Sequence, residues 1–486
     1  DITPPSISII GDNSINIYQN TIYMDAGATA IDDVDGDLTA SIITTGSVNT
    51  NLINSYTITY GVTDAANNST TATRQVNVLE DLNNPVYLDS NEITIKAKEW
   101  SEVGDTGYIN DVLYTVVDRE MLTSMLQNGS DVTKIATTKI TIMSNLFYNK
   151  TSFNQNIGNW DVSRVIDMEN MFSGTKDFNQ DIGDWNTSNV TNMKDMFRDA
   201  ASFNQDLSSW DVSKVSNMNF MFYNAKSFNK PLNSWDVSNV TDMSWMFVEA
   251  KSFNQDISEW NTSNVTSMEY MFFGADSFNQ SLTDWNTSNV TEMDRMFSEA
   301  LSFNGDISGW DTGNVESMSY MFDGAISFNQ EIGDWDTSNV TSTVGLFSGA
   351  VSFNQEIGDW NVSNVNSMYF MFDNASSFNK DISNWNTSEV RSTFEMFDGA
   401  ISFNGDISGW DTGNVETMRS MFSGALSFNR DISGWDTGNV ESMKSMFSGA
   451  SSFNQDIGDW NTINVTDMSS MFKGASSFNQ DISEWE

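Results

Sequence analysis

Carboxylate groups concentrated in one short loop are the residues of this chain best suited to bind a metal ion. The segment DDVDGD contains four aspartates within six residues, and few basic residues lie near it in the sequence. Because Ca²⁺ binds carboxylate and carbonyl oxygens, we predict a calcium site formed by this loop and an aspartate of a neighbouring turn. The spacing does not fit an EF-hand, and a turn rich in Asp and Gly without a cation is the alternative. The predicted ligands are Asp32, Asp33, Asp35, Asp37 and Asp64.

The composition leaves little chemistry for catalysis, because the chain contains no histidine and no cysteine. Ser–His and Cys–His nucleophile systems and cysteine zinc sites are therefore excluded. Paired carboxylates can hydrolyse glycosides, but here carboxylates recur regularly, whereas an active site is a local break in a repeat. The clearest breaks, Thr343 and Thr393, each replace a methionine, and Val344 and Phe394 beside them indicate local repacking. We predict a protein that is not an enzyme, with no catalytic residues and no cofactor other than calcium.

The charge of the chain restricts its partners. Its 486 residues carry a formal net charge of −44. This charge argues against nucleic acid or anionic lipid as a partner. No run approaches the roughly 18–20 apolar residues that a membrane span needs, so we expect no membrane-spanning segment within these residues.

A sequence of 25 residues repeats without a slip from Phe153 to the end of the chain. Phenylalanine recurs in every repeat up to Phe478, and tryptophan recurs in step from Trp160 to Trp485. A fixed period between roughly 20 and 50 residues is the signature of a solenoid, whose coils stabilise one another by stacking. We therefore predict a repeat solenoid of 13 to 14 coils over residues 140–486.

Within one coil, the apolar spacing predicts a short helical turn followed by a strand. Val165, Met168 and Phe172 fall on one face of a helix, together with residues up to Thr175. The segment Phe178–Trp185 is the expected strand side of the coil. The predicted fold is therefore mainly β with short helices.

We call the residues at the same position of successive repeats a column. Two columns hold an invariant residue, and each allows a structural and a functional interpretation. An asparagine follows each column phenylalanine, from Asn154 to Asn479. We favour a buried ladder in which these amides satisfy backbone groups, and an exposed ligand-binding row is the alternative. For the tryptophan column we favour a core with hydrogen-bonded indole N–H groups, because a bare aromatic stripe promotes aggregation. The alternative is a platform for stacking sugars.

A third column consists mainly of carboxylates. Like charges stacked at strand spacing repel one another. We favour solvated carboxylates that accept local hydrogen bonds, and a row of calcium ions is the alternative. The column comprises Asp181, Asp206, Asp256, Asp306, Glu331, Glu356, Asp381, Asp406, Asp431, Asp456 and Asp481.

The first 139 residues differ from the repeats. Short alternating stretches in residues 1–80 predict a β-sandwich. Residues 81–85 read as a linker. Residues 86–139 predict an α+β segment that caps the first coil, with a helix over Asp118–Gln127 that Asp118 begins.

Both parts resemble known families. The run VTDMSSMFKGASSFNQDISEW, residues 465–485, closely resembles the bacterial surface protein repeat of mycoplasma lipoproteins and Listeria surface proteins, and the BspA-type leucine-rich repeat. This resemblance implies a right-handed, leucine-rich-repeat-like solenoid on secreted or cell-surface proteins, without catalytic activity. The words TPPSISIIG (3–11), DAGATAIDDVDGDLT (25–39), YTITYGVTDAANN (56–68) and RQVNV (74–78) resemble bacterial immunoglobulin-like domains.

These observations predict a non-enzymatic extracellular protein for adhesion or surface display, as a fragment of a larger bacterial surface protein. Asp1 is expected to be an internal boundary, and Glu486 to be followed by more chain or by a stacked second chain. The expected partner is a protein or glycan on a cell surface, contacted along an extended face. The alternatives are a carbohydrate-binding module, with or without calcium, and a filament subunit that associates end to end. Positions expected to be exposed and variable are Gln180, Lys230, Gly305, Lys380 and Arg430.

Overall fold

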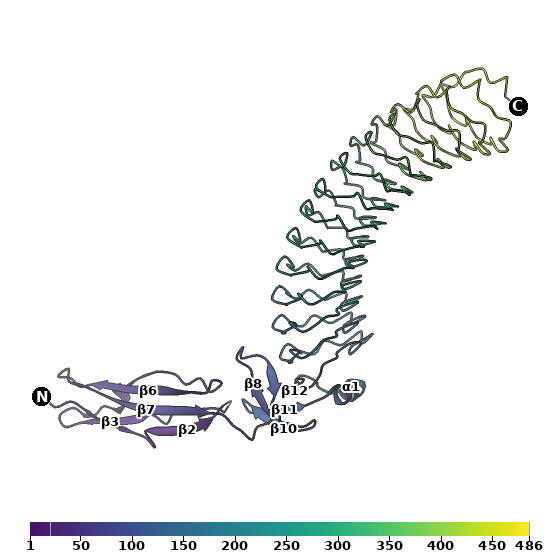
Figure 1. The fold of residues 1–486 in the computed structure, drawn as a ribbon. Coiled ribbons are helices and arrows are strands. Elements are labelled where there is room, and N and C mark those ends of the chain that lie inside the picture. The colour runs from purple at the N-terminus through teal and green to yellow at the C-terminus, as the bar shows by residue number, and fades with distance from the viewer. Residues whose placement is uncertain (20, 486) are drawn as a thin grey trace. The chain divides into compact units, whose positions relative to one another are not determined.

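The computed structural model describes residues 1–19 and 21–485, so the expectation for Glu486 lies outside the described residues. The chain forms two compact units (Figure 1). The N-terminal unit comprises Asp1–Thr141, Gln155–Arg164 and Asp184–Asn186. The repeat unit comprises Ile142–Asn154, Val165–Gly183 and Thr187–Glu486.

The first 80 residues form two β-sheets, in the orders β1-β3-β4 and β2-β7-β6-β5. In the long strand β6, Ile58, Tyr60 and Val62 alternate with more exposed residues, as expected for a strand with one face in a core. Ile58 and Tyr60 pack with Ala28 and Ile7 of the other sheet. The elements are β1 (Ser6–Ile9), β2 (Ser14–Tyr18), β3 (Ala28–Asp32), β4 (Gly36–Asp37), η1 (Thr39–Ser41), β5 (Ile43–Thr45), β6 (Asn54–Thr63) and β7 (Ser69–Leu79).

A buried arginine lies at the edge of this core. Arg74 is 2% exposed and forms an ion pair with Asp25. It also donates to the backbone carbonyls of Asp12 and Ile10. Tyr60 donates its hydroxyl to the same carboxylate at 2.7 Å, and burial together with this bond raises the pKa of Tyr60 to about 12. The network therefore joins a buried guanidinium to the carboxylate of an exposed residue at the edge of the sandwich.

The following segment combines short strands and one helix. Asp118 caps this helix as expected, because its side chain accepts a hydrogen bond from the Met121 N–H at 2.8 Å. The end of the segment contacts residues of the first coil, where the indole of Trp160 donates to the Val132 carbonyl at 3.0 Å. The elements are β8 (Val86–Leu88), β9 (Ile95–Ala97), β10 (Thr106–Ile109), β11 (Val112–Val116), α1 (Arg119–Gln127) and β12 (Ile135–Ala136).

The coils do not contain the helical turn and strand that the spacing predicts. In the described part of the repeat unit, the backbone forms consecutive turns and isolated parallel bridges, such as Asp167 to Asn192. Met168 and Phe172 donate their N–H groups to carbonyls of the next coil, whereas Met171 donates to the carbonyl three residues earlier. An α-helix would direct all these groups to the fourth preceding residue. The prediction was wrong because successive turns also bring every third residue to one side.

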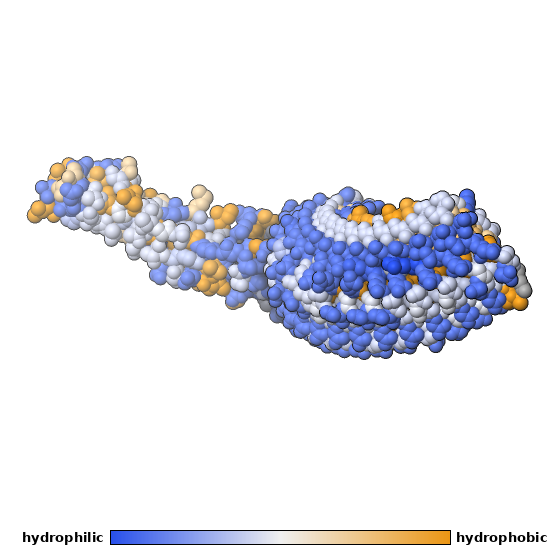
Figure 2. Space-filling model, turned by 90° about the horizontal axis from the view of Figure 1, so that it is seen from above, coloured by the Kyte–Doolittle hydropathy of each residue, from blue (hydrophilic) through white to orange (hydrophobic). Residues whose placement is uncertain are grey.

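Phenylalanine rings fill the interior of the coils. Within one coil, Phe172 and Phe178 stack with ring centroids 4.2 Å apart. Each ring also lies parallel to its equivalent in the next coil, at 5.5 Å for Phe172 and Phe197 and 5.9 Å for Phe178 and Phe203. The outer surface visible in Figure 2 is mainly hydrophilic. The core is therefore a continuous stack in which each coil is held by its two neighbours.

Candidate functional site

The ladder of turns places two backbone positions of each coil in the left-handed region. In one coil these positions are Asn170, with φ 54°, and Gly174, with φ 74°. This region favours Gly and tolerates Asn and Asp. The column of Gly174 contains only Gly, Asn, Asp and Glu, as in Asp199, Asn224 and Glu249.

The column of Asn170 holds large aromatic residues in five coils, with φ between 56° and 63°. A residue with a bulky side chain costs about 1–2 kcal/mol in this region. Backbone strain of this kind collects at functional sites, where the surroundings enforce it. This column is therefore the strongest candidate for a binding site in the repeat unit. Its aromatic members are Phe220, Trp245, Tyr270, Tyr320 and Phe370.

Four of these rings and two arginines form one continuous strip, which we call the aromatic row. Phe220 stacks on Trp245 with centroids 5.3 Å apart, and Trp245 stacks on Tyr270 at 3.9 Å. The guanidinium carbon of one arginine lies 5.8 Å from the Tyr270 ring centroid and 4.1 Å from that of Tyr320. All six side chains are half-buried. The row consists of Arg198, Phe220, Trp245, Tyr270, Arg295 and Tyr320.

The neighbours in the row cover much of the ring faces. Trp245 and Tyr270 are inclined by only 12°, so each shields a face of the other. Arg198 lies 5.3 Å from the centroid of Phe220 and shields that end of the strip. A sugar stacks on an open ring face, whereas a protein surface also packs against ring edges and arginine stems. The row therefore suits a protein partner better than a glycan.

The row ends where the next coil lacks a side chain. The residue equivalent to Tyr320 in the next coil is Gly345, with φ 60°. A Cβ atom at Gly345 would lie 2.3 Å from a carbon of the Tyr320 ring. Glycine at this position therefore allows the tyrosine ring to cover the backbone.

Carboxylates lie beside the aromatic row. Arg198 pairs with Asp195 at 3.2 Å. Burial raises the pKa of Glu269, and the negative charges of Asp294, Glu292 and Asp242 raise it further. A partner that places basic groups next to this cluster would relieve its repulsion.

The aromatic row was not predicted from the sequence, although the sequence contains a signal for it. The motifs MNFMF, MSWMF, MEYMF and MSYMF place an aromatic residue immediately before the invariant Met-Phe pair. The positions that were expected to be variable and exposed lie in another column. Gly305 of that column is buried, and the expectation of exposure was wrong there because its Cβ would lie 2.0 Å from the Gln280 carbonyl oxygen. Only Arg430 is fully exposed, and Gln180, Lys230 and Lys380 are half-buried.

The asparagine column forms the predicted ladder, but it is not buried. From Asn154 to Asn454, Oδ1 of each asparagine accepts the backbone N–H of the asparagine in the next coil: Asn154 accepts from Asn179 at 3.0 Å, and Asn279 accepts from Asn304 at 2.7 Å. The side chains from Asn154 to Asn479 are exposed or half-buried. The prediction of burial was wrong because the amides form their bonds along the exposed edge of the coils.

The tryptophan column belongs to the core, as predicted. Trp310 is 4% exposed, and its indole N–H donates to the Leu282 carbonyl at 2.7 Å. Trp335 and Trp360 make the equivalent bonds to Ile307 and Ile332. The column offers no platform for sugar stacking.

The carboxylate column also follows the favoured interpretation. Oδ1 of Asp206 accepts the backbone N–H of Ser208 at 2.8 Å, and Asp431 accepts that of Ser433 at 3.0 Å. These bonds lower the pKa of both aspartates. Their local geometry explains the carboxylates without a row of calcium ions. The two breaks in the repeat, Thr343 and Thr393, are buried side chains of the interior.

The predicted calcium ligands do not all lie together. Asp32 and Asp33 approach Asp1, which the sequence analysis missed. Asp35 accepts the Ala65 N–H and Asp64 accepts the Asn68 N–H, both at 2.8 Å. Asp37 accepts the Thr39 N–H at 2.9 Å.

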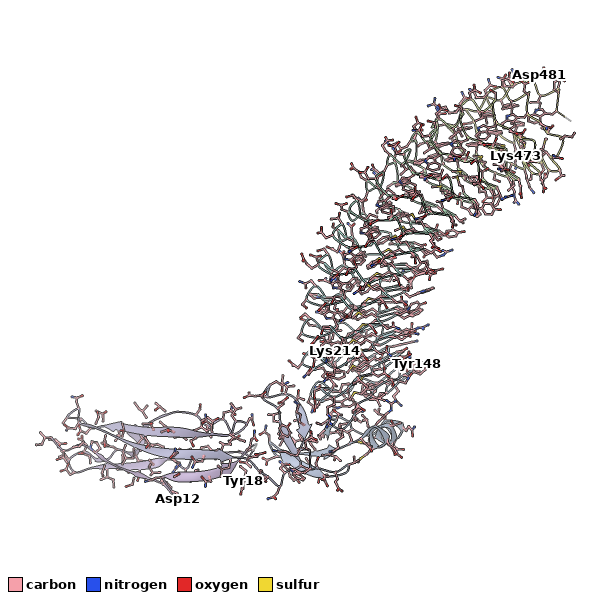
Figure 3. All side chains as sticks on the ribbon, viewed as in Figure 1. Asp12, Tyr18, Tyr148, Lys214, Lys473 and Asp481 are labelled. Carbon is pink, nitrogen blue, oxygen red and sulfur yellow. The ribbon has the colours of Figure 1, made fainter. Side chains whose placement is uncertain are left out.

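A polar groove lies on another side of the coils. It has a volume of about 570 Å³ and includes Asn289, Asn314, Glu316 and Thr341. Figure 3 shows Lys214, which belongs to the same column as Asn289, on the opposite side from Tyr148. Tyr148 belongs to the column of Arg198. The groove and the aromatic row are therefore separate surfaces.

A carboxylate cluster beyond the aromatic row predicts a dependence of stability on pH. Burial and the charge of Asp398 raise the pKa of Asp373 to about 6. An aspartate with a raised folded-state pKa destabilises the folded chain when ionised, so its penalty develops as the pH rises from about 4 to about 6 and persists above. We expect Asp373→Asn to stabilise the repeat unit by about 1 kcal/mol at pH 7.5, after allowance for solvent screening.

This gain should shrink at about pH 5, where Asp373 is largely protonated. Urea unfolding followed by tryptophan emission measures both values on the full chain. The matched control is Asp431→Asn, because Asp431 is exposed and its pKa is lowered. An equal gain at both pH values would contradict the assigned cause.

Two family models match the chain and define it as a bacterial surface protein, with an immunoglobulin-like domain before a repeat domain. Residues 7–78 match the family model described as "Bacterial surface protein, Ig-like domain". Residues 119–235, 224–333, 296–410 and 395–486 match the model described as "Mycoplasma protein of unknown function, DUF285". The chain belongs to the DUF285 family, which confirms the resemblance seen in the sequence. No curated protein matches the chain.

No catalytic family is identified among these matches. Within residues 1–19 and 21–485, no helix has the length and apolar character required to cross a membrane.

Proposed function

We propose that the chain is a non-enzymatic extracellular adhesion protein that binds another protein through the aromatic row. The observation that supports this proposal is the strain of Phe220, Trp245, Tyr270 and Tyr320, which hold left-handed backbone conformations with half-buried side chains. The fold imposes the left-handed backbone at this position in every coil but does not require an aromatic side chain there, since Asn170 and Ser445 hold the same conformation. Aromatic and arginine side chains are also the usual anchors of protein interfaces. The right-handed, leucine-rich-repeat-like winding of the coils remains a prediction.

The charges around the row favour a particular partner. Glu269, Glu292 and Asp294 lie beside it, and the whole chain carries a net charge of −44. An apolar protein surface flanked by lysine and arginine would cover the rings and neutralise these carboxylates. We therefore expect the partner to combine aromatic or aliphatic side chains with basic ones.

A random peptide library displayed on phage and panned on the immobilised full chain tests this function. We expect enriched peptides to combine apolar and basic residues. Trp245→Gly should weaken their binding at least about tenfold, because a central anchor is removed. The thermal midpoint should change little, because glycine fits φ 63° and the relieved strain offsets the lost stacking.

The matched control is Tyr148→Ala, which removes a 52% exposed aromatic ring outside the row. Its binding should equal that of the original chain. The proposal fails if no peptide is enriched or if Trp245→Gly binds the enriched peptides as well as the original chain does.

A carbohydrate-binding function is the second candidate, supported by the polar groove. Its asparagine amides are ordered, since Asn289, Asn314 and Asn339 each donate to a backbone carbonyl of the preceding coil at 2.6–2.7 Å. Hydroxyl, amide and carboxylate groups along an open groove suit the hydroxyl groups of a glycan. Binding on a glycan array that is lost in Glu316→Ala but kept in Trp245→Gly would favour this function.

A further inference from the structure

Three carboxylates meet at the turn between β3 and β4. One oxygen atom from each of Asp1, Asp32 and Asp33 lies within 4.8 Å of the other two. Strand β1 pairs antiparallel with β3, with Ser6 opposite Ile31. This register brings the residues before Ser6 alongside the residues after Ile31, which explains why the start of the chain reaches this turn.

One of these carboxylates is buried, and only one of its two oxygens accepts hydrogen bonds. Asp32 is 4% exposed, and its Oδ1 accepts the N–H groups of Val34 at 2.9 Å and Asp35 at 2.8 Å. Its Oδ2 is buried without a hydrogen-bond partner. Among the described residues, neither lysine nor arginine forms an ion pair with Asp1, Asp32 or Asp33. A buried carboxylate oxygen needs a compensating charge or donor.

We propose that Asp1, Asp32 and Asp33 bind a divalent cation, and that this cation is Ca²⁺. The donors are all carboxylate oxygens, which hard cations prefer. Ca²⁺ accepts an irregular set of six to eight oxygens, whereas Mg²⁺ requires a nearly ideal octahedron. An exposed side of the site, at Asp1 and Asp33, leaves room for water to complete the calcium shell.

This donor set differs from the one expected from the loop sequence. Asp35 and Asp37 use a carboxylate oxygen to accept N–H groups within the sandwich, and both lie outside the cluster. Asp64 uses both of its oxygens for Asn68. A bound cation would tie the first residues of the chain to the β3–β4 turn. The proposal is independent of the aromatic row and of the function assigned to it.

Isothermal titration of the chelator-treated full chain with CaCl₂ tests the site, at about 150 mM NaCl to screen the overall negative charge. We expect one saturable site with a stoichiometry near one. Asp32→Asn and Asp33→Asn should each weaken binding at least about tenfold, because each removes a ligand charge. Asp33 is exposed, so its variant should fold even if Asp32→Asn does not.

The matched control is Asp37→Asn, which removes the same charge from the same loop outside the cluster. Its affinity for calcium should equal that of the original chain. The proposal is overturned if no saturable binding occurs at millimolar calcium, or if Asp33→Asn binds calcium as tightly as Asp37→Asn does. Tighter binding of MgCl₂ than of CaCl₂ would overturn the assignment of the ion.

Discussion

Replacing Arg74 by alanine is expected to destabilise the immunoglobulin-like domain. The substitution removes a 2% exposed guanidinium and leaves the carboxylate of Asp25 without its charged partner. Asp25 itself is exposed and stays hydrated, so the loss comes mainly from the hydrogen bonds that the buried guanidinium donates to the carbonyls of Asp12 and Ile10, and we expect it to be about 2–3 kcal/mol. A small domain has about 5–15 kcal/mol of stability in total, so this loss is a large fraction.

Hydrogen exchange measured by mass spectrometry resolves the effect within the full chain. Peptides from β6 and β7 should lose protection in Arg74→Ala, whereas peptides of the repeat unit should keep it. Arg164→Ala is the control, because Arg164 is half exposed and pairs with Glu99 at 3.5 Å. That variant should change stability by less than about 1 kcal/mol. Unchanged protection of β6 in Arg74→Ala would show that the ion pair contributes little.

Replacing Trp310 by alanine should strongly destabilise the repeat unit. The indole is 4% exposed and lies 6.1 Å from Phe297 and 6.0 Å from Trp335, measured between ring centroids. Its removal leaves a cavity and takes one of two hydrogen bonds from the Leu282 carbonyl, which also accepts the Trp285 N–H at 3.1 Å. Truncation of a buried tryptophan to alanine costs about 3–5 kcal/mol.

Trp310→Phe separates the two contributions. A phenyl ring keeps most of the packing but cannot donate to the Leu282 carbonyl, so we expect a loss of about 1–2 kcal/mol. Leu301→Ala is the control, because Leu301 is 41% exposed, and its effect should stay within about 0.5 kcal/mol. Urea unfolding followed by the emission of the remaining tryptophans measures all three variants. Equal midpoints for Trp310→Ala and Leu301→Ala would contradict the assignment of the column to the core.

The sequence was sufficient to predict the columns, because every coil packs against coils of nearly the same sequence. Phe178 and Trp185 recur with the same period, so a repeating core and bonded indoles followed from spacing and residue type. The local conformation was not predictable in this way. Val165, Met168 and Phe172 fit both a helix and a chain of turns, and only hydrogen bonds to a residue 24 positions later distinguish the two.

The candidate sites show the same limit. The residue types of Trp245 and Tyr270 give no sign of their left-handed backbone, because that conformation is normally predicted at Gly or Asn. Asp1 could not be placed beside Asp32 without the register of β1 and β3. Residue types identified the chemistry, whereas contacts between distant segments decided which residues take part.

The asparagine ladder has a consequence for the length of the protein. Each step of the ladder joins an asparagine to its own equivalent in the next coil, as Asn179 accepts the Asn204 N–H, so no coil is distinguished by its place in the ladder. Whole coils of 25 residues can therefore be gained or lost, each changing the reach by about 4.8 Å, while every ladder bond re-forms. The aromatic row lacks this freedom, because Trp245 needs Phe220 before it and Tyr270 after it. Length is thus adjustable in the outer coils, and recognition is tied to a fixed group of them.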